Sequence, residues 1–248
     1  MAFDFRGISV EHQQAAQKIG TDAVLLAGFF LKFAPKWGET ASLGADLGAG
    51  SGVIGLLLAH RLPLTQVFLV EKEELAASEC AQNARNTVGA ERALAVQASI
   101  PDWTPPQPLD WAVSNPPYFT GGLTGNTRRD SARHRSHLPP EALGAWCRAH
   151  IRPGGIVALV VPDASDYVAH CGLPSLWIAV SARPDEKPTR HLALWTDWGK
   201  TGAANKQHMA SPERHESLYD GEGQPSEFYR DLCGTLMLRM PPIPIKRG

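Results

Sequence analysis

The sequence lacks the features that mark several specialised classes of protein. Its four cysteines, Cys80, Cys147, Cys171 and Cys233, show no C-x-x-C spacing, which argues against a zinc site or a disulfide framework. The formal net charge is only -1, so we expect no attraction of the whole molecule to nucleic acid. Contact with a polyanion would have to come from a local patch of charge. The sequence also contains no internal repeat.

Long hydrophobic runs are missing as well. The longest one, residues 23–31, is interrupted by Lys32 and is too short to cross a bilayer. The stretch MAFDFRGISV has no basic segment followed by an apolar one, which a secretory signal would need. We therefore expect a cytoplasmic protein that makes no contact with a membrane.

The composition is nevertheless that of a folded protein with one sizeable core, since 43% of the 248 residues are hydrophobic. We predict a single domain over residues 1–240 and a disordered tail over residues 241–248. A short N-terminal extension is predicted to be helical, because residues 11–33 place apolar side chains at helical spacing. Gly20 is followed by two residues typical of helix caps and divides this pattern into two helices.

From residue 41 to residue 162, strand-like runs alternate with helical patterns, as in a parallel sheet. The segments are ASLGADLGAGSGVIGLLLAHRL, TQVFLVEKEELAASECAQNARNTVG, ALAVQAS, LDWAVSN, EALGAWCRAHIRPGG and IVALVVP. The later runs SLWIAVSAR and RHLALWTDW flank a polar loop and predict a hairpin, whereas residues 199–226 predict a loop and residues 225–232 a short helix. The predicted fold class is α/β: a doubly wound, mostly parallel, seven-stranded Rossmann-like sheet with an antiparallel edge hairpin.

A glycine-rich turn, DLGAGSGVIG, follows the first of these strands and opens a helix. Glycines at such a turn let a ligand approach the backbone, and the N–H groups of the helix start point outward. Gly50, Gly52 and Gly55 satisfy G-x-G-x-x-G, and Glu71 follows at about the distance of an acidic residue that holds ribose hydroxyls. A nicotinamide cofactor is therefore one interpretation, and a turn that only packs the helix on the strand is another.

Asp46 favours a different cofactor. It lies immediately before the turn, where a carboxylate would repel a pyrophosphate but attract an ammonium group. S-adenosylmethionine carries an ammonium, a sulfonium and a ribose, but no phosphate. Asp46 before Gly48, Gly50 and Gly52, with Glu71 at the end of the second strand, therefore suits S-adenosylmethionine better.

The stretch VSNPPYF, residues 113–119, ends a later strand. A proline restricts the residue before it to extended geometry and fixes its own φ, so Asn115 is held in place. Its amide oxygen and a nearby backbone carbonyl can accept both hydrogens of a planar –NH2 group, while Tyr118 offers a face for stacking. Such a pocket favours methylation of the amino nitrogen of adenine, because two acceptors help that nitrogen to become tetrahedral. A strand-ending proline turn with two core aromatics is the alternative.

Taken together, these motifs resemble the class I S-adenosylmethionine-dependent methyltransferases that modify exocyclic or amide nitrogen. The resemblance is carried by DLGAGSGVIGLLLA, VEKEELAASECAQNA and NPPYF. The upstream segment HQQAAQKIGTDAVLLAG is similar to the one that precedes the glycine turn in bacterial tRNA(Val) adenine-N6 methyltransferases, which modify the adenine beside the anticodon. The resemblance implies S-adenosylmethionine as the cofactor and tRNA, or another structured RNA, as the partner.

The resemblance also implies roles for individual residues. The amine pocket would consist of Asn115, Pro116, Pro117 and Tyr118. The cofactor would contact Thr21, Asp22, Asp46, Gly48, Gly50, Gly52, Glu71, Lys72, Ser99, Ile100 and Asn115. Thr21 and Asp22 are equally suited to capping a helix. Ser99 stands where relatives commonly carry an aspartate that touches the cofactor's adenine, so either the affinity falls or Asp102 substitutes.

An arginine-rich loop follows the amine pocket directly, where a flipped base would leave its phosphates. Its arginines are Arg128, Arg129, Arg133 and Arg135. The loop is interpreted either as an RNA contact or as an ordinary solvated basic loop. Lys18 and Arg190 are further candidates for the same RNA-binding surface.

Other functions stay open on the sequence. Methylation of a glutamine side chain in release factors presents the same planar –NH2 group, although enzymes of that kind carry a sizeable helical domain before the glycine turn. Ribosomal RNA, methylated at adenine or guanine, is another candidate substrate. From other classes, a nicotinamide oxidoreductase and a non-catalytic RNA-binding relative are the alternatives.

Overall fold

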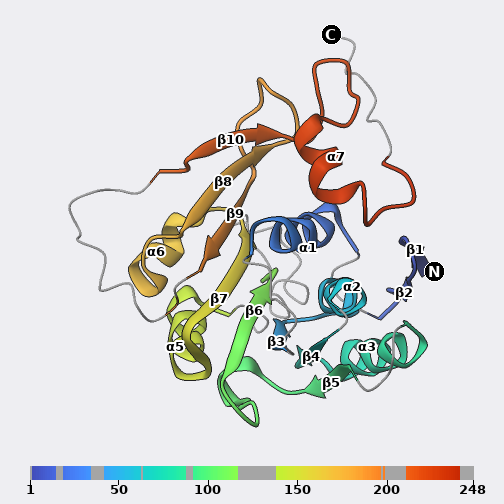
Figure 1. The fold of residues 1–248 in the computed structure, drawn as a ribbon, viewed down its shortest axis with the longest axis vertical. Coiled ribbons are helices and arrows are strands. Elements are labelled where there is room, and N and C mark those ends of the chain that lie inside the picture. The colour runs from blue at the N-terminus through green and yellow to red at the C-terminus, as the bar shows by residue number, and fades with distance from the viewer. Residues whose placement is uncertain are drawn as a thin grey trace, which may run out of the picture.

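The computed structural model describes residues 2–14, 19–34, 42–62, 64–87, 92–116, 138–196, 198 and 211–240. The centre of this part of the chain is an eight-stranded sheet flanked on both faces by helices (Figure 1). In chain order the strands are β3 (Ser42–Leu47), β4 (Thr65–Glu71), β5 (Ala93–Gln97), β6 (Leu109–Ser114), β7 (Ile151–Val161), β8 (Leu176–Ser181), β9 (Arg190–Trp195) and β10 (Arg214–Ser217). Their spatial order is β10-β8-β9-β7-β6-β3-β4-β5.

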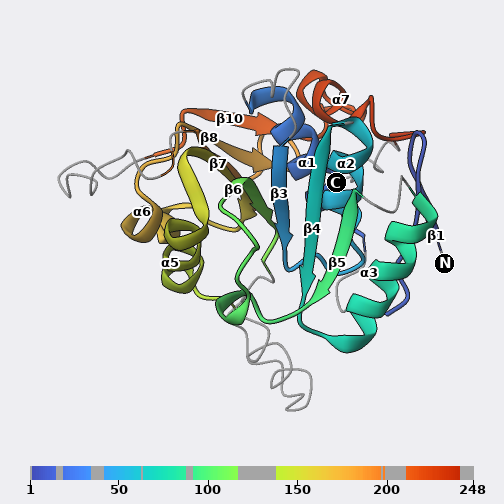
Figure 2. The same ribbon diagram turned by 60° about the horizontal axis from the view of Figure 1, so that its bottom comes forward.

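Most neighbouring strands of this sheet are parallel. The five strands from β7 to β5 in the spatial order all run in one direction, and β3, β4 and β5 lie side by side in Figure 2. Strand β9 is antiparallel to both β7 and β8, and β10 pairs with β8 in parallel. A separate small sheet consists of the antiparallel strands β1 (Ala2–Asp4) and β2 (Ser9–Glu11).

The helices form a layer on each face of the large sheet. They are α1 (Thr21–Phe33), α2 (Val53–Arg61), α3 (Glu74–Thr87), α5 (Pro140–His150), α6 (Ser165–Cys171), α7 (Glu227–Cys233) and the 3-10 turn η1 (Ile100–Asp102). Figure 1 shows α5 and α6 on one side of the sheet and α1, α2, α3 and α7 on the other. In the described part of the chain, no helix has the length and apolar character needed to cross a membrane.

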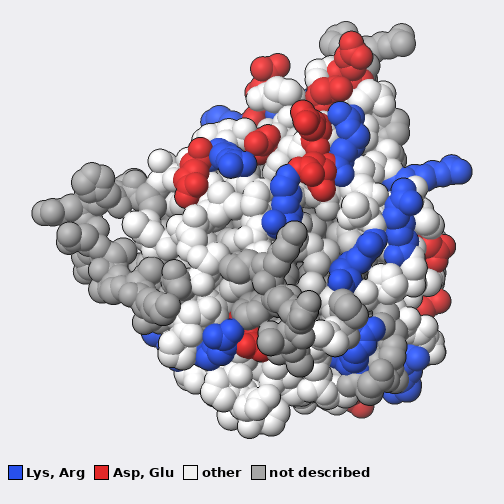
Figure 3. All heavy atoms as spheres, viewed as in Figure 1, with Lys and Arg blue, Asp and Glu red and all other residues white. Residues whose placement is uncertain are grey.

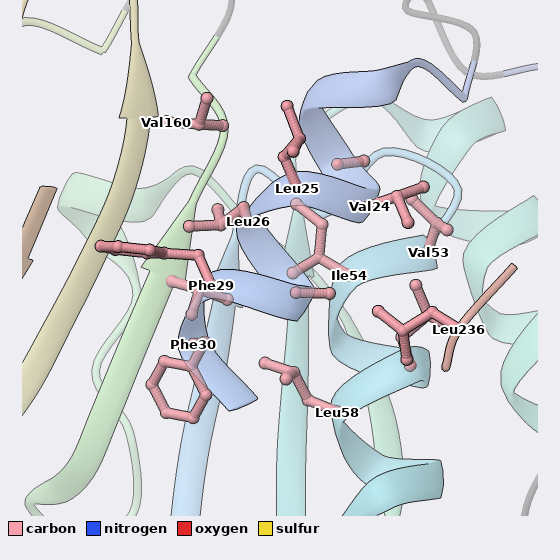
Figure 4. Close-up of a cluster of buried hydrophobic side chains, with 14 of the residues drawn as sticks. Val24, Leu25, Leu26, Phe29, Phe30, Val53, Ile54, Leu58, Val160 and Leu236 are labelled. Carbon is pink, nitrogen blue, oxygen red and sulfur yellow. The ribbon is translucent and has the colours of Figure 1, made fainter. Parts of the chain in front are cut away.

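Each face of the sheet carries its own hydrophobic core. The larger core packs α1 and α2 against the sheet, and Figure 4 shows Leu25 and Phe29 of α1 in the same cluster as Ile54 of α2. The smaller core lies under α5 and α6. A β-carbon on Gly44 would lie 2.0 Å from the ring of Trp111, so the missing side chain of this strand residue leaves room for the indole. Alternate residues of a strand face opposite sides, which is why one strand serves both cores.

The structure confirms the predicted fold class and differs from it in detail. The sheet has eight strands rather than seven, because β10 lies within the region predicted as a loop. Its sequence, RHES, has no apolar alternation, and pairing with β8 alone makes it a strand. The predicted hairpin exists as β8 and β9, but β10 rather than the hairpin forms that edge of the sheet.

The N-terminal extension also differs from the prediction. Glu11 belongs to β2, and residues 12–14 are not helical, so the first predicted helix is wrong over these residues, whereas the second helix is α1. Helix α6 was not predicted at all, since its seven residues are too few to show a helical period. The predicted short helix near the end is α7. The tail over residues 241–248 lies outside the described residues.

Candidate functional site

The candidate site lies at the carboxyl-terminal ends of the parallel strands. In the register of β3, Leu47 stands opposite both Val70 of β4 and Ser114 of β6. Gly48 and Asn115, which follow Leu47 and Ser114, therefore emerge side by side at these ends. The carboxyl ends of parallel strands are where open α/β sheets bind ligands. The two principal motifs of the sequence thus meet at one place.

The glycine turn after β3 has a backbone that suits a ligand site. Gly48, Gly50 and Gly52 have φ angles of 76°, 55° and 86°, the left-handed region that favours glycine. The N–H groups of Gly48 and Ala49 both donate to the carbonyl of Val70, at 2.9 Å each, which ties the turn to β4. A β-carbon on Gly48 would meet no atom of the described residues within 4 Å, so they leave the space over this residue open.

Glu71, the last residue of β4, holds the turn from the side. Its carboxylate accepts hydrogen bonds from the N–H of Gly50 and from the N–H of Glu73, both at 2.9 Å. The side chain is half-buried at the edge of the sheet. A carboxylate has about four lone-pair positions, so both oxygens keep the capacity to accept a hydroxyl.

Asp46 lies directly before the turn and is buried beneath it, and its contact with the ammonium group of a cofactor stays a prediction. The residue has no exposed surface, and its Oδ2 accepts the N–H of Gly55 in α2 at 2.8 Å. No hydrogen-bond partner within the described structure reaches Oδ1. Burial raises the pKa of this carboxyl to about 7, the hydrogen bond from Gly55 opposes the rise, and the charge of Glu71 adds to it. Asp46 can therefore act on a ligand through its charge and by holding the start of α2.

Asn115 directly follows the last residue of β6 and is half-buried. The residue before it is fixed to the neighbouring strand, because the hydroxyl of Ser114 donates to the carbonyl of Leu47 at 2.7 Å. Pro116 after it is buried. Pro117 and Tyr118, the rest of the predicted amine pocket, lie outside the described residues.

The next strand brings further predicted residues to the same edge. The N–H of Ala98 donates to the carbonyl of Glu71 at 3.0 Å, so Ser99 and Ile100 begin beside the end of β4. Lys72, Ser99 and Ile100 are half-buried, whereas Asp102, the predicted substitute for Ser99, is exposed within η1. Ser99 is therefore the nearer of the two to the sheet.

Thr21 and Asp22 open α1 without capping it. The N-cap residue is Gly20, with no side-chain hydrogen bond, so the capping role is wrong. The carboxylate of Asp22 forms an ion pair with the guanidinium of Arg190 at 2.7 Å. The side chain of Thr21 is hydrogen-bonded to Tyr229. Burial raises the pKa of the Tyr229 phenol, and the hydrogen bond with Thr21 partly opposes this rise. Arg190, a predicted RNA contact, is thus already engaged with Asp22. The other predicted RNA contacts lie outside the described residues: Lys18, Arg128, Arg129, Arg133 and Arg135.

The described residues offer nothing that resembles a metal centre, since no group of three or more His, Cys, Asp and Glu comes together in them.

Charge of both signs is present on the face of Figure 3, with acidic side chains in its upper part and basic ones toward its right. The described residues on this face therefore do not form a patch of a single sign of charge. The sequence also missed Asn83 and Glu79 of α3, which contact the turn and the N-terminal segment. Their only signal is a polar pair, four residues apart, on a helix face with Ala76, Cys80 and Ala84.

Comparison with known proteins agrees with this geometry. The family model "Methyltransferase small domain" matches residues 27–134. A structure of a predicted O-methyltransferase from Agrobacterium tumefaciens superposes with a TM-score of 0.62 at 22% identity, over 86% of this chain and 96% of that chain. A methyltransferase subunit of a type I restriction-modification system from Streptococcus thermophilus superposes with a TM-score of 0.53 at 17% identity, over 88% and 51%. The fold is therefore the methyltransferase fold.

Sequence relatives are more specific. A tRNA1(Val) (adenine(37)-N6)-methyltransferase from Aeromonas hydrophila is 37% identical over 96% of this chain and 98% of its own. The protein of the same name from Bacteroides fragilis is 32% identical over 92% and 97%. The chain belongs to the family of the tRNA1(Val) (adenine(37)-N6)-methyltransferases.

Proposed function

We propose that this protein transfers a methyl group from S-adenosylmethionine to the exocyclic N6 amine of an adenine in tRNA. The observation that carries the proposal is the position of Asn115 at the end of β6, directly beside the open glycine turn after β3. The names of the full-length relatives support the substrate, since they specify adenine 37 of tRNA1(Val). The substrate proposed for this chain is the same.

The residues of the turn fit S-adenosylmethionine. The open space over Gly48 admits a ligand to the backbone, and the carboxylate of Glu71 can accept ribose hydroxyls. Glu71 places negative charge at the turn, and Asp46 adds to this charge once its own carboxyl has ionised. This charge attracts an ammonium and a sulfonium but repels the pyrophosphate of a nicotinamide cofactor. The charge of the site therefore supports S-adenosylmethionine over the nicotinamide alternative.

The chemistry asked of the chain is to make a weak nucleophile reactive. The adenine amine is a poor nucleophile because its lone pair is delocalised into the ring, and S-adenosylmethionine, when bound, supplies a methyl group activated by a positively charged sulfur. Asn115 would accept one amine hydrogen through Oδ1, and a neighbouring backbone carbonyl would accept the other. Both hydrogen bonds strengthen as positive charge develops on the nitrogen, so they stabilise the transition state more than the bound substrate.

The atoms balance without a strong base on the chain. With S-adenosylmethionine bound, the amine nitrogen would gain the methyl carbon as this carbon leaves the sulfur, and the alkylated nitrogen would then release a proton to water. What Asn115 contributes is the in-line alignment of the amine and the two-acceptor geometry. The aromatic face assigned to Tyr118 would hold the base flat.

The experiment is methyl transfer to unmodified total tRNA, followed by mass spectrometry of the nucleosides. We expect N6-methyladenosine in tRNA and no transfer to unmodified release factor. Asn115→Ala should lower turnover by about 10²–10³-fold, the usual effect of removing one transition-state hydrogen bond. It should leave the dissociation constant for S-adenosylmethionine within a few-fold.

Three results would overturn the proposal. Methylation of release factor instead of tRNA would move the chemistry to glutamine. Tight NADH binding without binding of S-adenosylmethionine would assign the turn to a nicotinamide cofactor. Unchanged turnover of Asn115→Ala would remove the amine pocket from the mechanism.

A further inference from the structure

Helix α3 packs one face directly against the glycine turn. Cys80, on this face, has its sulfur 2.8 Å from the place where a β-carbon on Gly52 would lie. Glu79 and Asn83 flank it and are buried, with only 8% and 2% of their surface exposed. Buried polar side chains of this kind are costly unless they are hydrogen-bonded, so what they contact is informative.

Asn83 joins two separate parts of the chain. Its Nδ2 donates to the carbonyl of Ser51, inside the glycine turn, at 2.9 Å, and to the carbonyl of Glu11 at 2.8 Å. Its Oδ1 accepts the N–H of Glu11 at 2.9 Å. Both amide hydrogens and the amide oxygen are thus used, and one side chain ties β2 to the turn.

Glu79, one helical turn before Asn83, holds the residues that follow β2. Its Oε1 accepts the N–H of Gln13 at 2.6 Å, and its two oxygens accept the N–H of Gln14 at 3.1 and 3.0 Å. We name residues 11–14 the anchor segment. These three contacts are to backbone N–H groups, so they fix the path of the segment.

The anchor segment is also connected to the residues just before α1. The N–H of Ile19 donates to Nδ1 of His12 at 3.3 Å, and His12 is buried. Helix α1 then begins at Thr21, close to Arg190 through Asp22. Residues 11–14 are therefore held to α3, and the start of α1 is held to Arg190, the first residue of β9.

We propose that Asn83 and Glu79 are positioning residues for cofactor binding: they hold the anchor segment against the glycine turn and so set the shape of that turn. The inference rests on the proposed function, since it takes the turn to be the cofactor site. Three residues of two elements hold the turn: Val70 and Glu71 of β4 and Asn83 of α3. Without the hydrogen bond from Asn83, the carbonyl of Ser51 is no longer fixed to α3. The turn then adopts, for part of the time, conformations that bind the cofactor less tightly.

A purely structural role predicts something else. Loss of hydrogen bonds at α3 would then lower the stability of the whole fold without changing the affinity of the folded molecules for the cofactor. Asp110 provides a matched control, because its carboxylate accepts the N–H of Leu43 at 2.6 Å and pairs with Arg152 at the opposite edge of the sheet. Asp110→Ala removes comparable hydrogen bonds far from the turn.

The experiment measures binding of S-adenosylhomocysteine by calorimetry, together with steady-state kinetics and urea denaturation, on the full chain. Asn83→Leu should weaken binding about tenfold or more, as expected when hydrogen bonds of ordinary strength are lost. It should raise the KM for S-adenosylmethionine by a similar factor and leave kcat at saturating cofactor within about twofold. Glu79→Leu should act in the same direction, whereas Glu79→Gln keeps one acceptor oxygen and should recover most of the affinity. Asp110→Ala should lower stability but not affinity.

The outcomes separate this inference from the proposed function. If the unaltered protein binds no S-adenosylhomocysteine, the proposed function fails and the inference fails with it. If the unaltered protein binds but Asn83→Leu and Glu79→Leu bind equally well, only the inference is overturned. Equal weakening by Asp110→Ala would also overturn it, because the effect would then reflect general stability. If Asn83→Leu does not fold, the comparison of Glu79→Leu with Glu79→Gln decides.

Discussion

Replacing Asp46 by asparagine should change how the stability of the ligand-free protein depends on pH. The carboxyl has no exposed surface, and its pKa is raised from 3.8 to about 7, chiefly by burial. Asparagine has nearly the same shape and keeps an oxygen for the N–H of Gly55, but it carries no charge. The substitution therefore removes the titration and retains the contact with α2.

The sign follows from proton binding in the two states. Between pH 3.8 and about 7 the unfolded chain has released the proton of Asp46, whereas the folded protein retains it. The folded state thus binds more protons, and the free energy of unfolding falls as pH rises through this window. Below the window both states are protonated and no penalty exists, while above pH 7 the full penalty of the buried charge is present.

The magnitude can be worked out from the same values. From pH 5 to pH 8 the folded carboxyl stays protonated over about two pH units, and each unit is worth about 1.4 kcal/mol, so the natural protein loses about 3 kcal/mol relative to Asp46→Asn. The asparagine –NH2 group lacks a described partner at the position of Oδ1, which costs a further amount, but that cost does not depend on pH.

The assay is urea denaturation of both proteins at several pH values from 5 to 8. The difference between their free energies of unfolding is the quantity to follow, because all other titrating groups are shared and cancel. We expect it to shift steadily in favour of Asp46→Asn as pH rises. A difference that stays constant within about 0.5 kcal/mol over this range would refute the reasoning, since the carboxyl would then not be a buried, proton-retaining group in the folded state.

Three other predictions use different parts of the structure. Gly44→Ala should destabilise the protein by about 1–3 kcal/mol in urea denaturation because its β-carbon meets the indole of Trp111, whereas Gly221→Ala, with open space around it, should be nearly neutral. The hydroxyl oxygen of Ser226, the N-cap of α7, accepts the N–H of Tyr229 at 3.0 Å. Ser226→Ala removes this bond and should lower the free energy of unfolding by about 1 kcal/mol without changing the rate of methyl transfer. Neutralising Arg128, Arg129 and Arg133 together should weaken tRNA binding and make its affinity depend less on salt concentration. If the dependence of affinity on salt stays the same, the arginine-rich loop is excluded as an RNA contact.

Much of the fold and the two motifs of the site could be predicted because they depend on short stretches of chain. Glycines at three positions specify a turn with positive φ, and a proline after Asn115 restricts it whatever surrounds it. The alternation of strands and helices leads to a parallel sheet, and in such a sheet the strands end at one edge. That Gly48 and Asn115 lie near each other therefore followed from local patterns together with one rule of topology.

What could not be predicted depends on contacts between residues distant in the chain. Asp22 and Arg190 are 168 positions apart, and Asn83 binds both Ser51 and Glu11, which no periodicity connects. The RHES segment pairs with β8 without any apolar signal of its own, and whether a carboxylate such as Asp46 faces a ligand or the underside of a helix is set by packing. Local backbone preferences act over a few residues, whereas burial and hydrogen-bond pairing depend on which segments the folded chain brings together. The sequence therefore predicted which motifs form the candidate site, and the tertiary structure decided which distant residues contact them.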